Sequence, residues 1–527
     1  MPPIKVSDKA LAHLSRGLYR SPASALKELV SNAWDANAKR VRISTNYPNF
    51  LQLACLDDGD GFSREEFTVL MGGGIGNSLK RVQPPVLINN RPVIGRLGIG
   101  MLSIAQMCGA FTVTSRPKRG KPFRARVTLY DLLRERLDKP DTEVVKTAPE
   151  IVGTDGAQDA VEMVREVDIG KYEFLQLESD DLPLGTSIIA DDLHPSFVKA
   201  FQDSLTGPNF KEPNLKWPIS VRRFYEVTSL RELGDYWRLL WEMSVATPIP
   251  YLLPNALPEA VIKDEHKRLL SYDLTVIVDG ITLRKPVRLR GNPEGYTVVK
   301  FPPQAQSVYG RPLRFDGYLV VQEGREIKPA ELRGILIRIN NVAIGYYDST
   351  LLDYRINEGP RSRWVTGEVF VREGLENALN IDRDSFNQFH PEFRVVQEFV
   401  HSQAKTRLFA EVYKKIAERS ERRSHQRDVD RRNALKATLT EELGARVTIG
   451  GSAGAQATGT PSSVQVHAAK RKLTVVLPPE ESVRTKKANR NLAVAILTIF
   501  ETAMQQKHDT DRRSLFRRLL FRLLRNW

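Results

Sequence analysis

The sequence predicts an α+β protein, built from two successive domains that each contain a sheet and followed by a helical C-terminal region. Three observations predict this class. A helix over residues 25–37 has a continuous apolar side, as a helix packed on a sheet has. Strand patterns follow it closely, at VRIST and LQLACLDD. From residue 271 to residue 384 the chain again alternates strands, with few helical segments between them.

The length of 527 residues is too great for one hydrophobic core, and the apolar share of 41% with a charged share of 27% describes a globular protein. Composition shifts and proline-rich breaks divide the chain into six expected segments. These are a first domain at 1–200, a helical connector at 201–270, a second α+β domain at 271–400, a charged helix at 401–449, a flexible linker at 450–463 and a basic C-terminal region at 464–527.

The charge balance points to a polyanionic partner. The formal net charge is +15 and the isoelectric point is about 9.6. Nucleic acid is the first candidate for such a surplus, and an anionic membrane surface is the second.

Targeting signals and cysteine usage favour a cytoplasmic protein. The longest apolar run, residues 492–500, is far too short to span a membrane, and the N-terminus lacks the layout of a secretion signal. Cys55 and Cys108 are the only cysteines, and each lies within an apolar run. We expect both to be small core residues in a reducing compartment.

The helix over residues 25–37 has a polar side opposite its apolar side. At about 100° per residue, Glu28, Ser31, Asn32 and Asp35 fall on this polar side. An amide oxygen there could hold a hydrated cation, while a carboxylate takes a proton from water. A simple solvated helix face is the alternative.

The segment DDGDGF, residues 57–62, ends the second strand. Asp57 could accept a hydrogen bond from an exocyclic amine, and Gly59 and Gly61 would let the backbone approach a flat ligand. An ordinary acidic turn is the alternative. A calcium loop is a weaker one, because the later ligands of such a loop are missing.

Two glycine-rich segments follow. The first, residues 71–81 (MGGGIGNSLKR), precedes a proline-containing stretch and is typical of a mobile lid. In the second, Gly95, Gly98 and Gly100 precede an apolar helix. Backbone amides at such a helix start can approach phosphates. Strands are then predicted at FTVTSR, FRARVTLY and GTSIIADD.

Together these segments resemble a known family. ELVSNAWDAN, DDGDGF, GRLGIGMLS and GTSI occur in the order found in the ATPase superfamily of gyrase, heat-shock chaperones, histidine kinases and MutL, the GHKL superfamily. The likeness covers residues 4–195, including an N-terminal strap at 4–20. It is closest to the ninety-kilodalton heat-shock chaperones and to the microrchidia-type ATPases. It implies a Bergerat-type two-layer α/β sandwich that binds ATP and Mg²⁺, followed by a transducer-like second domain.

The resemblance also implies roles for individual residues. Glu28 would be the general base that activates water, Asn32 the magnesium ligand and Asp57 the acceptor for the adenine amino group. The other nucleotide-binding positions that it implies are Asp35, Gly59, Gly61, Lys80, Gly95, Gly98, Gly100 and Thr186.

A further candidate lies near the end of the second domain, in ENALNIDRDSFNQ. This segment resembles the chaperone turn that sends an arginine to the terminal phosphate of ATP, and the matching residue is Arg383. An always-charged planar donor suits that task. The alternative is a surface arginine paired with Asp382 or Asp384.

The C-terminal region extends beyond the resemblance. Its last helix, residues 511–527, has leucines at four-residue steps beside six arginines. Such a basic amphipathic helix suits nucleic acid, a membrane surface or a partner groove, and docking on its own domain or on a second subunit is equally open.

The expected activity is ATP hydrolysis that drives domain closure or homodimerisation on a macromolecule. That macromolecule is expected to be a nucleic acid held by a clamp or remodeller. A chaperone acting on client proteins and a structural subunit that only senses ATP are the alternatives.

Overall fold

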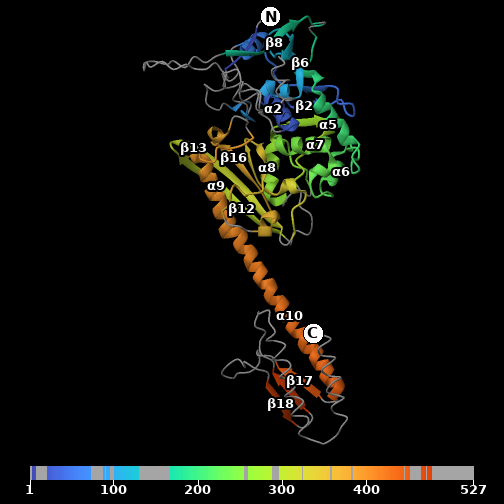
Figure 1. Ribbon diagram of the computed structural model, residues 1–527. Helices are drawn as coiled ribbons and strands as arrows, with labels where there is room; N and C mark the ends of the chain where they lie inside the picture. The colour runs from blue at the N-terminus through green and yellow to red at the C-terminus, as the bar shows by residue number, and fades with distance from the viewer. Residues whose placement is uncertain are drawn as a thin grey trace, which may run out of the picture. The chain divides into compact units, whose positions relative to one another are not determined.

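The structure, a computed structural model, describes residues 3–7, 21–72, 87–88, 91–94, 100–129, 166–177, 179, 181–253, 259–287, 296–322, 325–355, 359–380, 384–443, 446–450, 465–469 and 472–476 (Figure 1). The chain divides into two compact units, Met1–Ala410 and Glu411–Trp527. Among the described helices, none combines the length and the apolar character needed to cross a bilayer. The predicted α+β class is confirmed.

A nine-stranded sheet is the first layer of unit 1. Its strand order is β1-β8-β7-β6-β9-β3-β2-β10-β11, and only the β2–β10 pair is parallel. Residues alternate along the strands: in β2, Val41 and Ile43 are buried whereas Arg40 and Arg42 are exposed. One face of this sheet therefore packs on a core and the other faces solvent. The strands are Pro3–Ser7 (β1), Arg40–Ser44 (β2), Leu53–Asp57 (β3), Cys108–Arg116 (β6), Phe123–Leu129 (β7), Glu166–Leu175 (β8), Gly185–Leu193 (β9), Thr275–Val278 (β10) and Ile281–Thr282 (β11).

Helix α2 (Pro22–Asp35) is the central helix of the layer on the buried face (Figure 1). Ser21 caps it by accepting a hydrogen bond from the Ser24 N–H, and Pro22 occupies the first turn. The predicted apolar side is confirmed, because Leu26, Leu29, Val30 and Ala33 are buried. Other short elements of this region are α3 (Arg64–Gly72), β4 (Leu87–Ile88), β5 (Arg91–Pro92) and the 3₁₀ helix η2 (Gly100–Gln106).

The described residues of the segment 201–270, expected as a connector, are largely helical and pack into the core of the first sheet. Trp217, Trp237 and Trp241 are each buried in the cluster that also holds Leu26 of α2. Large aromatic side chains are stabilised by such burial. The helices are α5 (Pro195–Leu205), α6 (Trp217–Phe224), η4 (Leu230–Leu233), α7 (Asp235–Ala246) and α8 (Glu259–Ser271). Strands β10 and β11, just beyond them, complete the edge of the first sheet rather than joining the second.

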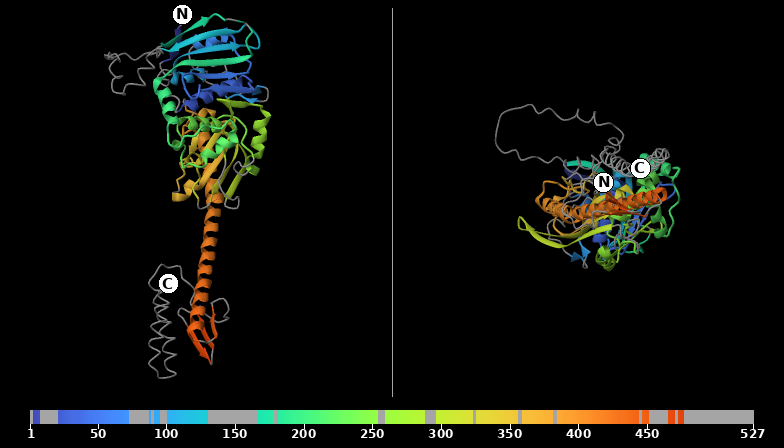
Figure 2. Two further views of the ribbon diagram at one scale, coloured as in Figure 1. Left: turned by 90° about the vertical axis from the view of Figure 1, so that its right-hand side faces the viewer. Right: turned by 90° about the horizontal axis from the view of Figure 1, so that it is seen from below.

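A second sheet of five strands, drawn in yellow to orange in Figure 2, has the order β12-β13-β16-β14-β15. Helix α8 packs on one face, where Ile262 and Leu269 cluster with Phe370. Helix α9 covers the other face, where the Phe399 ring meets Phe315 edge-on at 5.3 Å between centroids. The elements are β12 (Tyr296–Val308), β13 (Arg311–Gln322), η6 (Ala330–Leu332), β14 (Gly334–Ile339), β15 (Val342–Asp348), η7 (Gly359–Trp364), β16 (Val365–Glu373), η8 (Glu376–Ala378), α9 (Pro391–Gln403) and the π-helical turn η9 (Ala404–Phe409).

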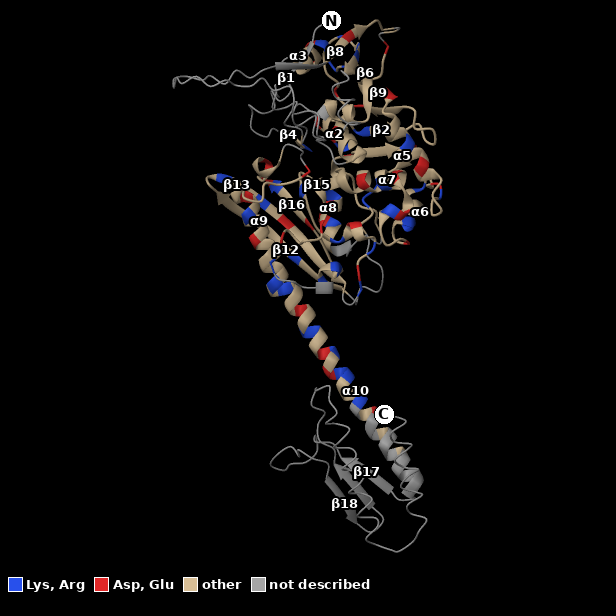
Figure 3. Ribbon diagram, in the orientation of Figure 1, with Lys and Arg blue, Asp and Glu red and all other residues tan. Residues whose placement is uncertain are grey.

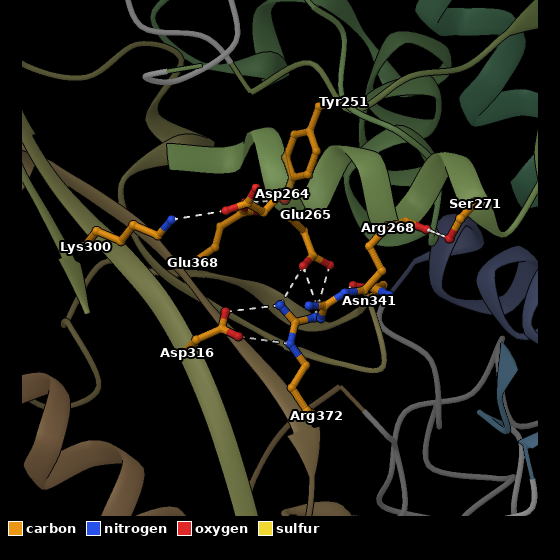
Figure 4. A network of polar contacts seen from close by, with 10 residues as sticks. All are labelled: Tyr251, Asp264, Glu265, Arg268, Ser271, Lys300, Asp316, Asn341, Glu368 and Arg372. Carbon is orange, nitrogen blue, oxygen red and sulfur yellow. Dashed lines mark hydrogen bonds and ion pairs between the residues drawn. The ribbon is translucent and has the colours of Figure 1, made fainter. Parts of the chain in front are cut away.

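Partly and fully buried ion pairs join helix α8 and the strands of this second sheet. Arg372 of β16 donates to Glu265 of α8 through Nη2 at 2.5 Å and to Asp316 of β13 through Nε at 3.1 Å (Figure 4). Deeper in the core, Glu368 accepts from Arg338 Nε at 2.8 Å. Burial opposes ionisation of Glu368, but the charge of Arg338 and the tyrosine hydroxyls around it hold its pKa below the ordinary value.

Unit 2 contains a long charged helix and a small sheet. The helix α10 spans Ala410–Leu443, and Figure 3 shows cationic and anionic residues interspersed along it, as the sequence predicts. Strands Arg446–Gly450 (β17), Gln465–Ala469 (β18) and Lys472–Val476 (β19) form a sheet in the order β17-β19-β18. Most of the predicted linker and the whole arginine- and leucine-rich last helix lie outside the described residues.

Candidate functional site

The predicted polar side of α2 is buried rather than solvated. Glu28 is 3% exposed, Ser31 1% and Asp35 7%, while Asn32 is partly exposed. Burial arises because the helix lies against both η2 and α7 as well as the sheet. The solvated-face alternative is therefore wrong. Carboxylates are rarely buried to this degree unless they have a partner or a chemical task.

Asp35 joins α2 to the chain that leads into the second glycine segment. Its Oδ1 accepts a hydrogen bond from the Ile94 backbone N–H at 2.8 Å. One residue earlier, Trp34 Nε1 donates to the Pro92 carbonyl at 2.8 Å. In this structure Asp35 therefore anchors the stretch that precedes Gly95, and its predicted nucleotide contact stays a prediction.

Asp57 ends β3, directly opposite Thr186 of β9 in the antiparallel register. Its Oδ1 accepts from the Gly59 backbone N–H at 2.9 Å. Burial raises the pKa of Asp57 to about 6, while backbone hydrogen bonds from Gly59 and Thr186 oppose the rise and the neighbouring Asp58 adds to it. The structure thus brings three of the predicted nucleotide-binding positions together at the end of two paired strands.

The two glycines of the DDGDGF turn have packing reasons for being glycine. A Cβ on Gly59 would lie 2.7 Å from the Ala36 carbonyl oxygen, at the end of α2. Gly61 has φ +63°, and a Cβ there would meet the Arg116 carbonyl oxygen at 2.3 Å. Close backbone packing explains both residues without a ligand. The turn itself is held on α2 by Asn37, whose Nδ2 donates to Asp60 at 2.6 Å.

Four predicted site residues lie outside the described part of the chain: Lys80, Gly95, Gly98 and Arg383. Gly100 is described and begins η2, the 3₁₀ helix found where the sequence predicts an apolar helix. η2 packs on α2, and the Ser103 hydroxyl donates to the Ala25 carbonyl at 2.9 Å.

A buried ion pair that sequence analysis missed links α2 to the segment of the second domain predicted to carry the arginine. Lys27 Nζ lies 2.5 Å from Asp384 Oδ1, and the two side chains are 4% and 2% exposed. Lys27 Nζ also donates to the Ala343 carbonyl of β15 at 3.4 Å. The sequence feature that could have indicated this ion pair is the lysine within the apolar stretch ALKELV. A lysine that is buried with the apolar side of a helix requires an anionic partner.

We expect Asp384→Ala to lower the free energy of unfolding by about 3–5 kcal/mol, because the Lys27 ammonium would stay buried without its counter-charge. Urea unfolding of the full chain measures this. The double variant Lys27→Met, Asp384→Leu is the control and should recover most of the loss, since it leaves no unpaired charge. A loss below about 1 kcal/mol in Asp384→Ala would contradict the buried pair.

The same ion pair lines a cavity of about 200 Å³ between α2, α7 and β15. Glu242 of α7 and Tyr346 of β15 also line it, and the Tyr346 hydroxyl donates to Glu242 Oε2 at 3.2 Å. Burial raises the pKa of Tyr346 to about 12, with the negative charge of Glu242 contributing. Glu28, Asn32 and Asp57 do not line this cavity, so it is separate from the predicted nucleotide site.

Comparison with known proteins identifies the first part of the chain. The profile of the family described as "Histidine kinase-, DNA gyrase B-, and HSP90-like ATPase" matches residues 19–154. This stretch contains α2, the Asp57 turn and η2. Residues 19–154 match the GHKL ATPase superfamily. The predicted resemblance to the GHKL superfamily is confirmed. The predicted closer likeness to the heat-shock chaperones has no specific support.

Two named proteins are similar to part of this chain. The chain is 37% identical over 101 residues to the putative type II restriction enzyme HgiDII of Herpetosiphon aurantiacus, covering 19% of this chain and 16% of that protein. It is 38% identical over 64 residues to the DNA mismatch repair protein MutL of Halalkalibacterium halodurans, covering 12% and 10%. The matches thus span at most about a sixth of the relatives' lengths.

A solved structure described as the N-terminal domain of a DNA repair protein aligns with 76% of this chain and 97% of its own, at 12% identity and a TM-score of 0.37.

Proposed function

We propose that this protein is a magnesium-dependent ATP hydrolase whose nucleotide-driven closure acts on nucleic acid. The observation that carries the proposal is the buried Glu28 one helical turn from the partly exposed Asn32, on the central helix of a GHKL domain. A carboxylate in that position can take a proton from an attacking water. An intact base of this kind favours hydrolysis over the alternative of a subunit that only senses ATP.

The residues present fit a magnesium ion that is shared with a nucleotide. Mg²⁺ prefers oxygen ligands, usually keeps several waters and needs only one or two protein groups beside phosphate oxygens. Asn32 supplies one neutral amide oxygen, and the carboxylate of Glu28 lies one turn away. We propose that Asn32 holds the ion, which would supply charge neutralisation at the phosphates.

The remaining roles follow the same order along the chain. Glu28 would orient and deprotonate water, Asp57 would accept from the adenine amino group, and Thr186 would lie beside it on β9. Asp35, Gly59, Gly61, Lys80, Gly95, Gly98 and Gly100 remain proposed nucleotide-binding positions. Arg383 would reach the terminal phosphate, and the Lys27–Asp384 pair holds the residue next to it against α2. ATP binding would favour a closed, homodimeric state.

A nucleic-acid partner is supported by where the positive charge lies. Residues 411–527 contain 24 Lys and Arg against 12 Asp and Glu, so they supply most of the net charge of +15. Two proteins similar to part of this chain are named as a putative type II restriction enzyme and a DNA mismatch repair protein. Cationic regions of this size bind the phosphate backbone through counterion release.

The proposal is tested by measuring ATP turnover of the full chain with and without duplex DNA or RNA, across a range of salt concentrations. Stimulation that fades as salt rises is the expected result. Turnover that nucleic acid leaves unchanged, but that an unfolded client protein stimulates, would favour the chaperone alternative. Absence of turnover under every condition, with ATP still bound, would favour the ATP-sensing alternative.

The Asp57 carboxyl predicts a pH dependence of ATP binding. Its folded-state pKa of about 6 lies above the ordinary value of 3.8, so the apo protein protonates this group as pH falls through 6. Only the ionised carboxylate offers its full acceptor capacity to the adenine amine. We therefore expect ATP affinity to fall about tenfold between pH 7 and pH 5.

Isothermal titration at the two pH values measures this, with Asp57→Asn expected to lose most of the affinity at both. Asp191→Asn, at an exposed carboxylate on β9, is the control and should keep the wild-type profile. Wild-type affinity in Asp57→Asn would remove Asp57 from the nucleotide site.

A further inference from the structure

The face of the nine-stranded sheet that points away from the helices is open and cationic. Side chains alternate between the two faces of a strand, so residues in register across the sheet share a face. One outward row runs through Arg42, Leu56, Ser187, Thr114 and Arg124, on strands β2, β3, β9, β6 and β7. Arg42 is exposed and Leu56 is 41% exposed, and the other three residues of the row are partly exposed.

The charges on this outward face are unbalanced. Among the described strand residues its cations are Arg40, Arg42, Arg116, Arg124, Arg126 and Lys171. The acidic strand residues described on this face, Glu173 and Asp191, are fewer. Asp191 pairs with Arg126 at 3.3 Å, and Asp181, outside the strands, lies 3.8 Å from Arg116. Within the described residues, the side chains of Arg40, Arg42 and Arg124 form no ion pair. An excess of free guanidinium groups on one face is the electrostatic footprint of a surface that binds phosphates.

Four arginines of the outward face form two pairs, which lie on two different strands of the sheet. Arg40 and Arg42 lie on β2, and Arg124 and Arg126 lie on β7, four strand positions away in the sheet order. At about 4.8 Å per strand the pairs are about 19 Å apart. The major groove of B-DNA is about 12 Å wide, and the two backbones lie beyond its edges, so arginine pairs that are farther apart than the groove is wide can lie over both backbones. Hydroxyls between them, such as Thr114 and Ser187, can donate to further phosphate oxygens.

We infer that this outward face binds the phosphate backbone of double-stranded DNA. The described outward strand positions lack aromatic side chains, on which binders of single strands stack bases. A second copy of the chain is a poor occupant, because two like-charged faces repel. The inference rests on the nucleic-acid partner proposed above and adds a docking surface in unit 1, distinct from the basic region at 411–527.

The test is the salt dependence of binding to a DNA duplex of mixed sequence, measured on the full chain. The slope of log affinity against log salt concentration is proportional to the number of phosphates that the protein neutralises. Loss of phosphate contacts on the sheet therefore lowers the slope even when residues 411–527 still contact the duplex. The double variant Arg42→Gln, Arg124→Gln should lower the slope by about 2 and weaken binding by at least about tenfold at low salt. The matched control Lys263→Gln, Lys267→Gln, on the exposed side of α8, should leave both unchanged.

Site-specific cross-linking supplies a second readout. Cys55 and Cys108 are the only cysteines and both are buried; burial raises the pKa of the Cys108 thiol to about 12 and that of Cys55 further. An added surface cysteine is therefore the reactive one. Leu56→Cys, carrying a photoactivated cross-linker, should attach to the duplex. Leu270→Cys, at an α8 residue that is 52% exposed, is the control and should not.

The outcomes separate this inference from the proposed function. If wild-type protein binds DNA but the arginine variant keeps its slope, or both cysteines cross-link equally, the outward face is not the docking surface and the proposed function stands. If wild-type protein does not bind duplex DNA, the nucleic-acid partner fails and the inference fails with it. Binding of anionic vesicles but not of DNA, lost in the arginine variant, would also overturn it. Thermal unfolding at the wild-type temperature confirms that the variants are folded.

Discussion

Glu28→Ala is expected to abolish ATP hydrolysis while leaving ATP bound. General-base catalysis contributes about 10² to 10⁴ in rate, and it acts on the attacking water rather than on the bound nucleotide. Single-turnover measurement of phosphate release, beside isothermal titration with ATP, separates the two effects. The variant should also accumulate in the closed, ATP-bound state, because hydrolysis is what would release it.

Burial of Glu28 makes a second variant necessary. Its side chain is 3% exposed, so alanine leaves a cavity that could weaken the fold by itself. Glu28→Gln keeps the volume and removes the base, and it should show the same loss of hydrolysis with an unchanged melting temperature. Ser31→Ala is the control on the same face of α2 and should keep most of the turnover. If Glu28→Gln failed to bind ATP while staying folded, the role of general base would be wrong.

Arg383→Ala is expected to lower turnover by about 10² or more with only a modest change in ATP affinity. A guanidinium at the terminal phosphate is needed chiefly in the transition state, where negative charge develops. Steady-state kinetics should therefore show a lower kcat with a similar KM. Arg383→Lys should restore little, because a point charge on a flexible stem does not reproduce the planar fork.

Substitutions at exposed, ion-paired arginines elsewhere in the second domain supply the comparison that identifies the role of Arg383. If Arg383 were only a surface ion pair, Arg383→Ala would change turnover no more than Arg314→Ala or Arg363→Ala, at exposed arginines that pair with Glu373 and Glu326. A shortened chain ending near residue 200 would be a poorer test. Strand β10 completes the first sheet from residues 275–278, and α7 packs on α2, so the shortened chain would expose part of its own core.

The order of elements around the nucleotide site could be predicted from sequence because each depends on local chemistry. Ser21 and Pro22 specify the start of α2, and the spacing of Leu26, Leu29, Val30 and Ala33 specifies its packed side. The alternation in RVRIS specifies a strand with arginines on one face. These patterns involve residues within one or two turns of each other, so they are visible in the sequence.

The glycines of the DDGDGF turn show a packing role that local reasoning did not predict. Gly59 and Gly61 were predicted to make room for a ligand. In the structure they make room for Ala36 and Arg116, which approach from other elements. A sequence shows that a small residue is required but not which neighbour requires it, because the neighbour arrives only when the chain folds.

The sequence by itself determined the superfamily, the α+β class and the candidate base, cation ligand and adenine acceptor. Only the tertiary structure decided that the polar side of α2 is buried, that β10 and β11 extend the first sheet, and that Lys27 is neutralised by Asp384. It also decided which arginines share the open face of that sheet. The physical reason is common to all four. Burial, sheet order and ion pairing between residues separated by tens to hundreds of positions are properties of packing, and the free energy of each depends on neighbours that the sequence does not place.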